Sequence, residues 1–366
     1  MTTIFLCGDV MTGRGIDQIL PHPGDPALRE SVVTDARTYV TLAERVNGEI
    51  TRPVPFAWPW GDALSVLDDL APDVRLINLE TAVTSADDFT PGKAVHYRMN
   101  PRNAGCLTAV RPDVCVLANN HVLDFGPSGL AETLRTLSGL GIQYVGAGRD
   151  VQEAHRAAVS DAAAGRVLTV AAGLKSSGVP PRWAAREDRP GVAYVGDLSD
   201  HSAVRLADRV MASKQAGDVT VVSLHWGSNW GYDVDDDQVR FAHRLIEAGV
   251  DVVYGHSSHH PRLIEVYRGR LILYGCGDLV NDYEGIQPYR AFRDELRLLY
   301  FASVDPAGAL TVLRMVPMRV CRMRLERAGQ EDSEWLRTTI EDASERFGTR
   351  LDNQRDGTLT VTGHDR

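Results

Sequence analysis

The feature of this sequence that most restricts its fold is a series of short apolar runs rich in Val, Ile and Leu. The runs lie at residues 4–7, 74–79, 114–118, 167–172, 219–224, 250–254 and 270–274. Near-continuous apolar runs are typical of strands that are buried on both faces. Between several of these runs, apolar residues recur at the three- and four-residue intervals of a helix, for example at 130–137 and at 241–246. This alternation predicts an α/β layered protein with a central sheet.

The last third of the chain is expected to contain more antiparallel strand. The stretches 264–274 and 300–316 each predict a hairpin, the first turning at Gly269 and the second at residues 305–308. A polar helix is predicted around Glu334–Phe347.

Polar side chains follow the apolar runs at the points where these runs end. The residues at these ends are Asp9, Asn78, Glu80, Asn119, Asn120, His121, Asp124, His225, Asn229, His256, His259, His260, Asp278, Asn281 and Asp282. In open α/β sheets ligands bind outside the carboxyl ends of the strands. We therefore expect side chains from several separate loops to converge on one pocket a few ångströms across.

The donor types in this set suit a metal ion. Carboxylates, one carboxamide oxygen and several imidazoles are ligands for borderline divalent cations such as Zn, Mn or Fe. A carboxylate that bridges two ions about 3.5–4 Å apart is the arrangement of two-metal hydrolases. The sequence thus predicts a site for one or two divalent ions, although a site without metal stays open.

The series GDVMTGR, NLE, LANNHVLDFG, GAG, HWGSNWGY, GHSSHHP and YGCGDLVNDYEG resembles the CapA family of capsule and poly-γ-glutamate synthesis proteins. Within that family the chain is similar to the actinobacterial polyglutamine synthesis accessory proteins. The resemblance covers residues 1–325. It implies a metallophosphoesterase-like α/β fold, a two-sheet sandwich flanked by helices, with the site at the carboxyl ends of the strands.

A C-terminal helix and tail at 326–366 would pack on this domain or trail from it, and residues 353–366 are expected to be frayed. Residues 21–60 are expected to form an irregular surface excursion.

The resemblance also implies roles for individual residues, with departures from the family pattern. Met11 stands where metallophosphoesterases have a histidine, and the spacing from His256 to His259 is one residue longer than theirs. The implied metal ligands are Asp9, Glu80, Asn120, His225, His256 and His259. One position would use Glu80, Asn120, His225 and His256; the other would use Asp9, Glu80 and His259. His121 would protonate the leaving group.

Several residues around this set are candidates for binding substrate. Arg14, Lys93 and Arg98 could pair with carboxylate or phosphate, or be ordinary solvated cations. Trp226 and Trp230, in the loop HWGSNWGY, could line a groove for an extended polymer or be ordinary packing, and Asn229 of the same loop is a further candidate for substrate contact. His260 precedes a proline and is expected to face solvent.

Three functions are compatible with these residues. The first is a metal-dependent hydrolase that cleaves a phosphoester or amide bond in the synthesis or processing of a poly-glutamate or polyglutamine polymer, with Asp9 and His259 completing the site. The second is a metal-independent epimerase of a peptide Cα, in which Asp9 and either His256 or His259 exchange protons. The third is a non-catalytic accessory subunit of a polymer synthase.

The composition excludes other classes. Lys plus Arg is 39 against 49 Asp plus Glu, and the formal charge of -10 argues against nucleic-acid binding. No uncharged run approaches the roughly 18 residues of a membrane helix. Five cysteines without a CxxC pair predict buried free thiols. Without a basic leader, the protein is expected to be cytoplasmic or peripheral to the cell envelope.

Overall fold

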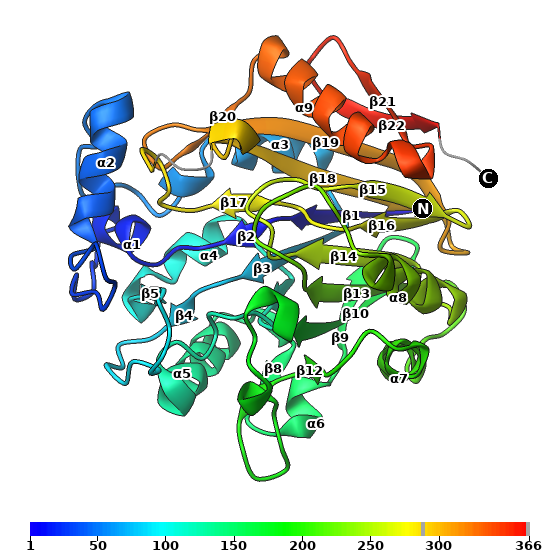
Figure 1. The fold of residues 1–366 in the computed structure, drawn as a ribbon, viewed down its shortest axis with the longest axis horizontal. Helices are drawn as coiled ribbons and strands as arrows, with labels where there is room; N and C mark the ends of the chain where they lie inside the picture. The colour runs from blue at the N-terminus through cyan, green and yellow to red at the C-terminus, as the bar shows by residue number, and fades with distance from the viewer. Residues whose placement is uncertain (287–289, 364–366) are drawn as a thin grey trace.

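Two β-sheets form the centre of the protein (Figure 1). The computed structural model describes residues 1–286 and 290–363. The larger sheet contains β1 (Thr2–Cys7), β2 (Asp9–Val10), β3 (Val74–Leu79), β6 (Val114–Val116), β7 (Gln143–Val145), β17 (Asp278–Val280), β18 (Leu296–Val304), β19 (Leu310–Val320), β20 (Leu325–Arg327), β21 (Arg350–Asn353) and β22 (Leu359–Gly363). The smaller sheet contains β9 (Ala158–Ala162), β10 (Gly165–Leu174), β12 (Tyr194–Val195), β13 (Val219–His225), β14 (Val252–His256), β15 (Ile264–Tyr267) and β16 (Arg270–Leu273).

Helices and short connections surround these sheets. The helices are α1 (Gly15–Ile19), α2 (Arg37–Asn47), α3 (Ala63–Leu70), α4 (Gly105–Ala109), α5 (Gly126–Gly139), α6 (Val151–Ala154), α7 (Asp200–Met211), α8 (Asp236–Glu247) and α9 (Gln330–Ala343). Single 3-10 turns lie at Trp58–Trp60, Pro101–Asn103, Lys175–Ser177, Pro181–Trp183, Arg290–Phe292 and Glu345–Phe347. Two short ladders join β4 (Ala82–Val83) to β5 (Arg98–Met99) and β8 (Ala147–Gly148) to β11 (Gly191–Val192).

The two sheets pack against each other through one apolar core. Ile4 and Phe5 of the larger sheet share this core with Val167, Val221 and Val252 of the smaller sheet. A second core fills the space between the outer face of the smaller sheet and helices α7 and α8. The predicted α/β two-sheet sandwich flanked by helices is therefore confirmed.

The strands that carry the site run parallel and end at the same level. In the larger sheet β2 is parallel to both β3 and β17, so that Asp9 lies beside Asn78 on one side and Asp278 on the other. In the smaller sheet β10, β13 and β14 are parallel, and His225 pairs in register with His256. The carboxyl ends of both sheets thus bring polar side chains to one edge.

The two predicted hairpins are confirmed as β15–β16 and β18–β19. The expectation of a frayed tail is wrong for residues 353–363, because β22 pairs with β21 and with β19 and extends the larger sheet. Residues 364–366 lie outside the described residues. The excursion at 21–60 is not wholly irregular, since α2 lies within it.

Among the described helices, not one is long and apolar enough to cross a lipid bilayer. The cysteine prediction is confirmed for four thiols, since Cys7, Cys106, Cys115 and Cys276 are buried and free, while Cys321 is partly exposed.

Candidate functional site

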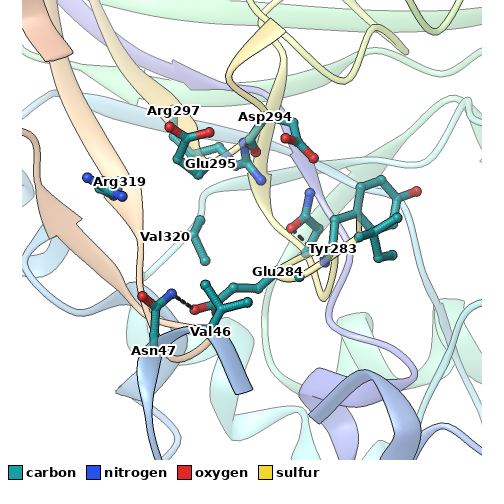
Figure 2. Close-up of a pocket in the computed structure, with 12 residues that line it drawn as sticks. Val46, Asn47, Tyr283, Glu284, Asp294, Glu295, Arg297, Arg319 and Val320 are labelled. Atoms are coloured by element: carbon teal, nitrogen blue, oxygen red, sulfur yellow. Dashed lines mark hydrogen bonds between the residues drawn. The ribbon is translucent and has the colours of Figure 1, made fainter. Parts of the chain in front are cut away.

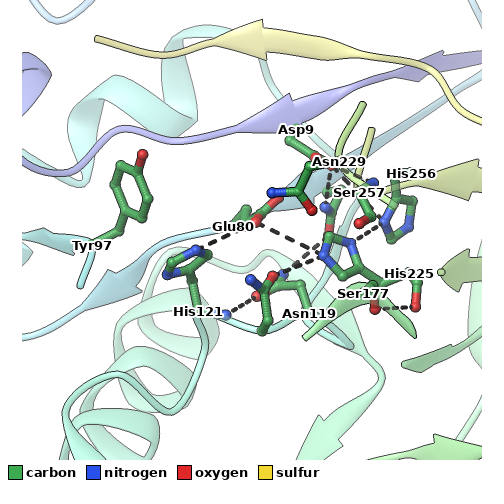
Figure 3. Close-up of polar contacts among 12 residues, drawn as sticks. Asp9, Glu80, Tyr97, Asn119, His121, Ser177, His225, Asn229, His256 and Ser257 are labelled. Atoms are coloured by element: carbon green, nitrogen blue, oxygen red, sulfur yellow. Dashed lines mark hydrogen bonds and ion pairs between the residues drawn. The ribbon is translucent and has the colours of Figure 1, made fainter. Parts of the chain in front are cut away.

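The predicted donor residues meet at the shared edge of the two sheets (Figure 3). Asp9 comes from β2, Glu80 follows β3, and His121 follows β6, whereas His225 and His256 end β13 and β14. All five are buried, with His121 the most exposed at 8%. The predicted convergence of separate loops on one pocket is confirmed.

A first group of possible metal ligands consists of Asp9, His225 and His256, whose donor atoms lie within 4.8 Å of one another. The Nδ1 atoms of the two histidines are 2.7 Å apart, and Asp9 Oδ1 is 3.9 Å from His256 Nδ1. The other ring nitrogen of His256, Nε2, is 2.6 Å from the hydroxyl of Ser223. An outer hydrogen bond of this kind fixes the orientation of a ligating imidazole. Nδ1 of His256 therefore faces the site.

A second group consists of Asp9, His259 and Asp278, again with donor atoms within 4.8 Å. His259 Nδ1 is 3.0 Å from Asp278 Oδ1, and Asn281 donates a 2.6 Å hydrogen bond to Asp278 Oδ2. Met11 is buried nearby, and its backbone N–H donates to the backbone oxygen of Val280. Asp278 supplies the second carboxylate of this group. Asp9 belongs to both groups.

Glu80 and Asn120 border the first group. Asn120 Oδ1 is 2.8 Å from His225 Nε2, and Glu80 Oε1 is 3.8 Å from the same nitrogen. The second oxygen of Glu80, Oε2, is buried and has no hydrogen-bond partner among the described residues. A buried polar oxygen without a partner is costly. It marks a position where a cation would be stabilising.

The charges of the site also fit a divalent ion. Burial, followed by repulsion from Asp278, raises the pKa of Asp9 to about 7. Burial and the charge of Asp9 raise the pKa of Glu80 well above its ordinary value. Burial lowers the pKa of His256 to about 3 and that of His225 well below its ordinary value, so that both rings are neutral and can ligate. A divalent ion would relieve the repulsion between carboxylates. The donor set therefore fits such an ion.

His121 is oriented by its own carboxylate. Asp124 Oδ2 lies 2.6 Å from His121 Nδ1, and Lys93 forms an ion pair with the same carboxylate. Despite the opposing effect of burial, the neighbouring charges lower the pKa of Asp124, so it is ionised and accepts a hydrogen bond from Nδ1. Nε2 of His121 then faces Glu80 Oε1 at 3.7 Å. Burial lowers the pKa of His121 to about 4, so Nε2 must gain a proton before it can donate one.

Figure 2 draws the residues that line a cavity whose volume is about 170 Å³ and which is linked to the second group through Asn281. Asn281 both lines the cavity and donates to Asp278. Arg297, at another wall, is buried and donates to the backbone oxygens of Asp294 and Leu296. Although burial of Asp278 opposes it, the charge and hydrogen bond of His259, followed by the positive charge of Arg297, lower the pKa of that carboxyl group. This cavity wall therefore supports the ionised form of Asp278.

Two residues predicted to bind substrate are buried. Trp226 is buried in the core beneath α8, stacks on Tyr274 and donates to the backbone oxygen of that residue, so it cannot line an open groove. Arg14 is also buried, and its guanidinium group donates to Asp282, Glu30 and Tyr39. The prediction is therefore wrong for both residues, because their side chains are buried as well as engaged within the protein.

The other candidates differ in their distance from the site. Lys93 lies 3.3 Å from His121 Nδ1, and Asn229 is exposed with its Nδ2 3.1 Å from His259 Nε2. Arg98 is paired with Asp87 and packs on the ring of Phe125. Lys93 and Asn229 therefore remain predictions for substrate contact. The contacts of Arg98 connect it to neither donor group, so the prediction of substrate contact has less support for Arg98.

His260 does not face solvent as expected. It is 1% exposed, and the rings of Trp230, Tyr232 and Phe292 enclose it. Its Nε2 has no hydrogen-bond partner among the residues that the structure describes. The aromatic rings and a 3.0 Å contact between His260 Nδ1 and the backbone oxygen of Pro261 hold the ring in place.

Asp278 and Asp124 were among the strand-end residues expected to converge, but neither was predicted to be a ligand or a catalytic residue. The detectable signal was the series of polar strand ends itself, which includes both carboxylates.

The chain is similar to bacterial proteins of capsule and polymer synthesis. The profile described as bacterial capsule synthesis protein PGA_cap matches residues 3–283. The chain is 57% identical over 364 residues to a probable polyglutamine synthesis accessory protein of Mycobacterium tuberculosis, covering 99% of this chain and 96% of that protein. It is 28% identical over 236 residues to the PGA biosynthesis protein CapA of Bacillus subtilis, covering 64% and 59% respectively. A 5'-nucleotidase precursor from Thermus thermophilus aligns with 93% of this chain and 59% of its own, at 15% identity and a TM-score of 0.48.

Proposed function

This chain belongs to the bacterial capsule synthesis protein PGA_cap family, and from that membership we propose that it is a metal-dependent hydrolase acting on a glutamate or glutamine polymer. The names of its relatives, a polyglutamine synthesis accessory protein and a PGA biosynthesis protein, support this class of polymer. The bond cleaved is a phosphoester or an amide formed during synthesis or processing of the polymer.

The proposal depends on one observation, that two groups of buried donors share the carboxylate of Asp9. His225 and His256 would hold one ion with Asp9, and His259 and Asp278 would hold another. A divalent ion bound there would supply Lewis acidity and an activated water molecule. Two ions sharing one carboxylate are the arrangement that suits hydrolysis.

The remaining residues have roles in proton transfer and substrate placement. His121 would donate a proton to the leaving group from Nε2, while Asp124, 2.6 Å from Nδ1, offsets the positive charge of the protonated ring. Lys93, with 15% of its side chain exposed, would contact an anionic group of the substrate. Asn229, exposed beside His259, would contact the polymer on the opposite side.

Metal content tests the proposal directly. After removal of metal with a chelator, we expect Mn, Zn or Fe to rebind at one to two ions per chain. At a free metal concentration of about 100 times Kd, binding should stabilise the folded state by about 2.7 kcal/mol. The measurements are elemental analysis and thermal unfolding. Protein that binds no metal after reconstitution, and melts at an unchanged temperature, would contradict the ligand assignment.

The same preparation separates the other functions. Hydrolysis of phosphoester or γ-glutamyl substrates that disappears with chelator supports the proposal and identifies the bond. Metal binding without turnover of either substrate would favour a non-catalytic accessory role, which the name of the mycobacterial relative suggests. Deuterium uptake from heavy water at a peptide Cα, unaffected by chelator, would favour epimerisation.

A further inference from the structure

A second set of charged residues lies on α6 and α7, away from the candidate metal site. Two adjoining hollows on this surface share His155, Arg205 and Arg209, and Arg156 lines one of them. We call these four residues and the two hollows the α7 groove. His155 follows α6 directly, while Arg205 and Arg209 lie one turn apart on α7.

The α7 groove is positively charged although the chain as a whole carries a formal charge of -10. Arg156, Arg205 and Arg209 are exposed, and among the described residues they form no ion pair. Asp208 is the one carboxylate among the described residues that line the two hollows. Burial, followed by the charges of Arg209 and Arg205, lowers the pKa of His155 to about 4. The groove therefore holds uncompensated cations that would attract an anion.

The position of the α7 groove connects it to the metal site. One hollow is lined by Tyr194 of β12, and Tyr194 pairs in register with Gly173 of β10. Gly173 pairs with His225, which in turn pairs with His256. The backbone of Tyr194 therefore lies on the same row across the smaller sheet as His225 and His256, two strand spacings or about 10 Å from His225. The Tyr194 end of one hollow therefore reaches the strand ends that carry the site, while the rest of the groove follows α7 over the outer face of the sheet.

We infer that the α7 groove binds the carboxylates of an acidic glutamyl polymer and leads that polymer toward the metal site. This inference rests on the proposed function for the identity of the polymer. Guanidinium groups bind carboxylates with two parallel hydrogen bonds. Arg205 and Arg209 are separated by about 6 Å along the helix axis, so they can contact successive carboxylates of one chain. A glutamine polymer lacks these carboxylates and would not be held.

The test is binding of a fluorescently labelled poly-γ-glutamate oligomer to the full chain kept free of metal by chelator. Replacing both arginines, as Arg205→Ala with Arg209→Ala, should weaken Kd by roughly tenfold, because two exposed charge contacts are lost. The matched control is Arg135→Ala, an exposed arginine of α5, which should leave Kd unchanged. Added salt should weaken wild-type binding.

Equal affinities of the double variant and the wild type would overturn the inference, as would equally tight binding of a glutamine polymer. If inorganic phosphate binds the groove as tightly as the oligomer does, the groove is a simple anion site and the assignment of a polymer ligand is overturned. Since both arginines are exposed, melting temperatures should stay the same and exclude unfolding. The assay contains no metal, so its result is independent of the metal-content test.

Discussion

Asp9→Asn is expected to eliminate metal binding at both positions at once. Asp9 is the one residue common to the two donor groups found among the described residues. Loss of an outer partner of a metal ligand costs about 10–100-fold in metal affinity, so loss of a shared ligand should cost at least about 100-fold. Any metal-dependent hydrolysis should fall by a similar factor. Elemental analysis and isothermal titration with Mn or Zn measure the effect.

Asp278→Asn provides the matched comparison. It alters only the second group, so a chain with two ions should retain one, held by Asp9, His225 and His256. Neither variant should unfold the metal-free protein. Asp9 and Asp278 are buried neighbours across β2 and β17, and burial followed by the charge of Asp278 raises the pKa of Asp9 to about 7, so Asp9→Asn should raise the melting temperature of the metal-free chain above that pH. Asp278 lies 3.0 Å from His259 Nδ1, and despite burial the charge of His259 lowers the pKa of Asp278, so Asp278→Asn should lower the melting temperature. Unchanged metal stoichiometry in Asp9→Asn would show that Asp9 is not a ligand.

The strands and the position of the site could be predicted from the sequence because both follow from simple physical rules. A strand buried on both faces needs a continuous apolar run, and β13 is buried along its whole length. Such a strand cannot keep an ionisable side chain in its middle, so these side chains gather where it ends. His225 and His256 at the ends of β13 and β14 were identifiable for this reason.

The direction of each side chain could not be predicted in the same way. Neighbouring residues of an extended chain point to opposite sides, so Trp226 enters the core beneath α8 while His225 faces the site. Pairing between distant segments is also absent from local patterns. Asp278 joins the site because β17 pairs with β2, and the short segment β22 is ordered because β19 offers it an edge.

Asp282→Asn is expected to destabilise the fold by about 3–5 kcal/mol, the usual cost of removing one partner from a buried ion pair. Arg14 and Asp282 have side chains 3% and 0% exposed, and two nitrogens of the guanidinium group contact the two carboxylate oxygens at 3.1 and 2.5 Å. Without the carboxylate charge, the guanidinium group stays buried with Glu30 as its remaining anion. Chemical denaturation measures the loss.

An exposed pair gives the control. Asp35 and Arg37 are also 2.5 Å apart, but their side chains are 37% and 65% exposed. Asp35→Asn should therefore cost no more than about 1 kcal/mol. If Asp282→Asn costs no more than this control, the buried pair adds nothing to stability.

The cost should come from the stranded charge rather than from lost attraction, and a double variant separates these causes. Arg14→Met combined with Asp282→Leu removes both charges, so it should be more stable than Asp282→Asn alone. The metal content of Asp282→Asn should be unchanged, because Asp282 belongs to neither donor group.

The guanidinium group of Arg14 also packs on the ring of Tyr39 in α2, at 3.9 Å from the ring centroid. Loss of the pair should therefore loosen α2 first, which amide hydrogen exchange would detect as faster exchange over residues 37–47 than in the core strands.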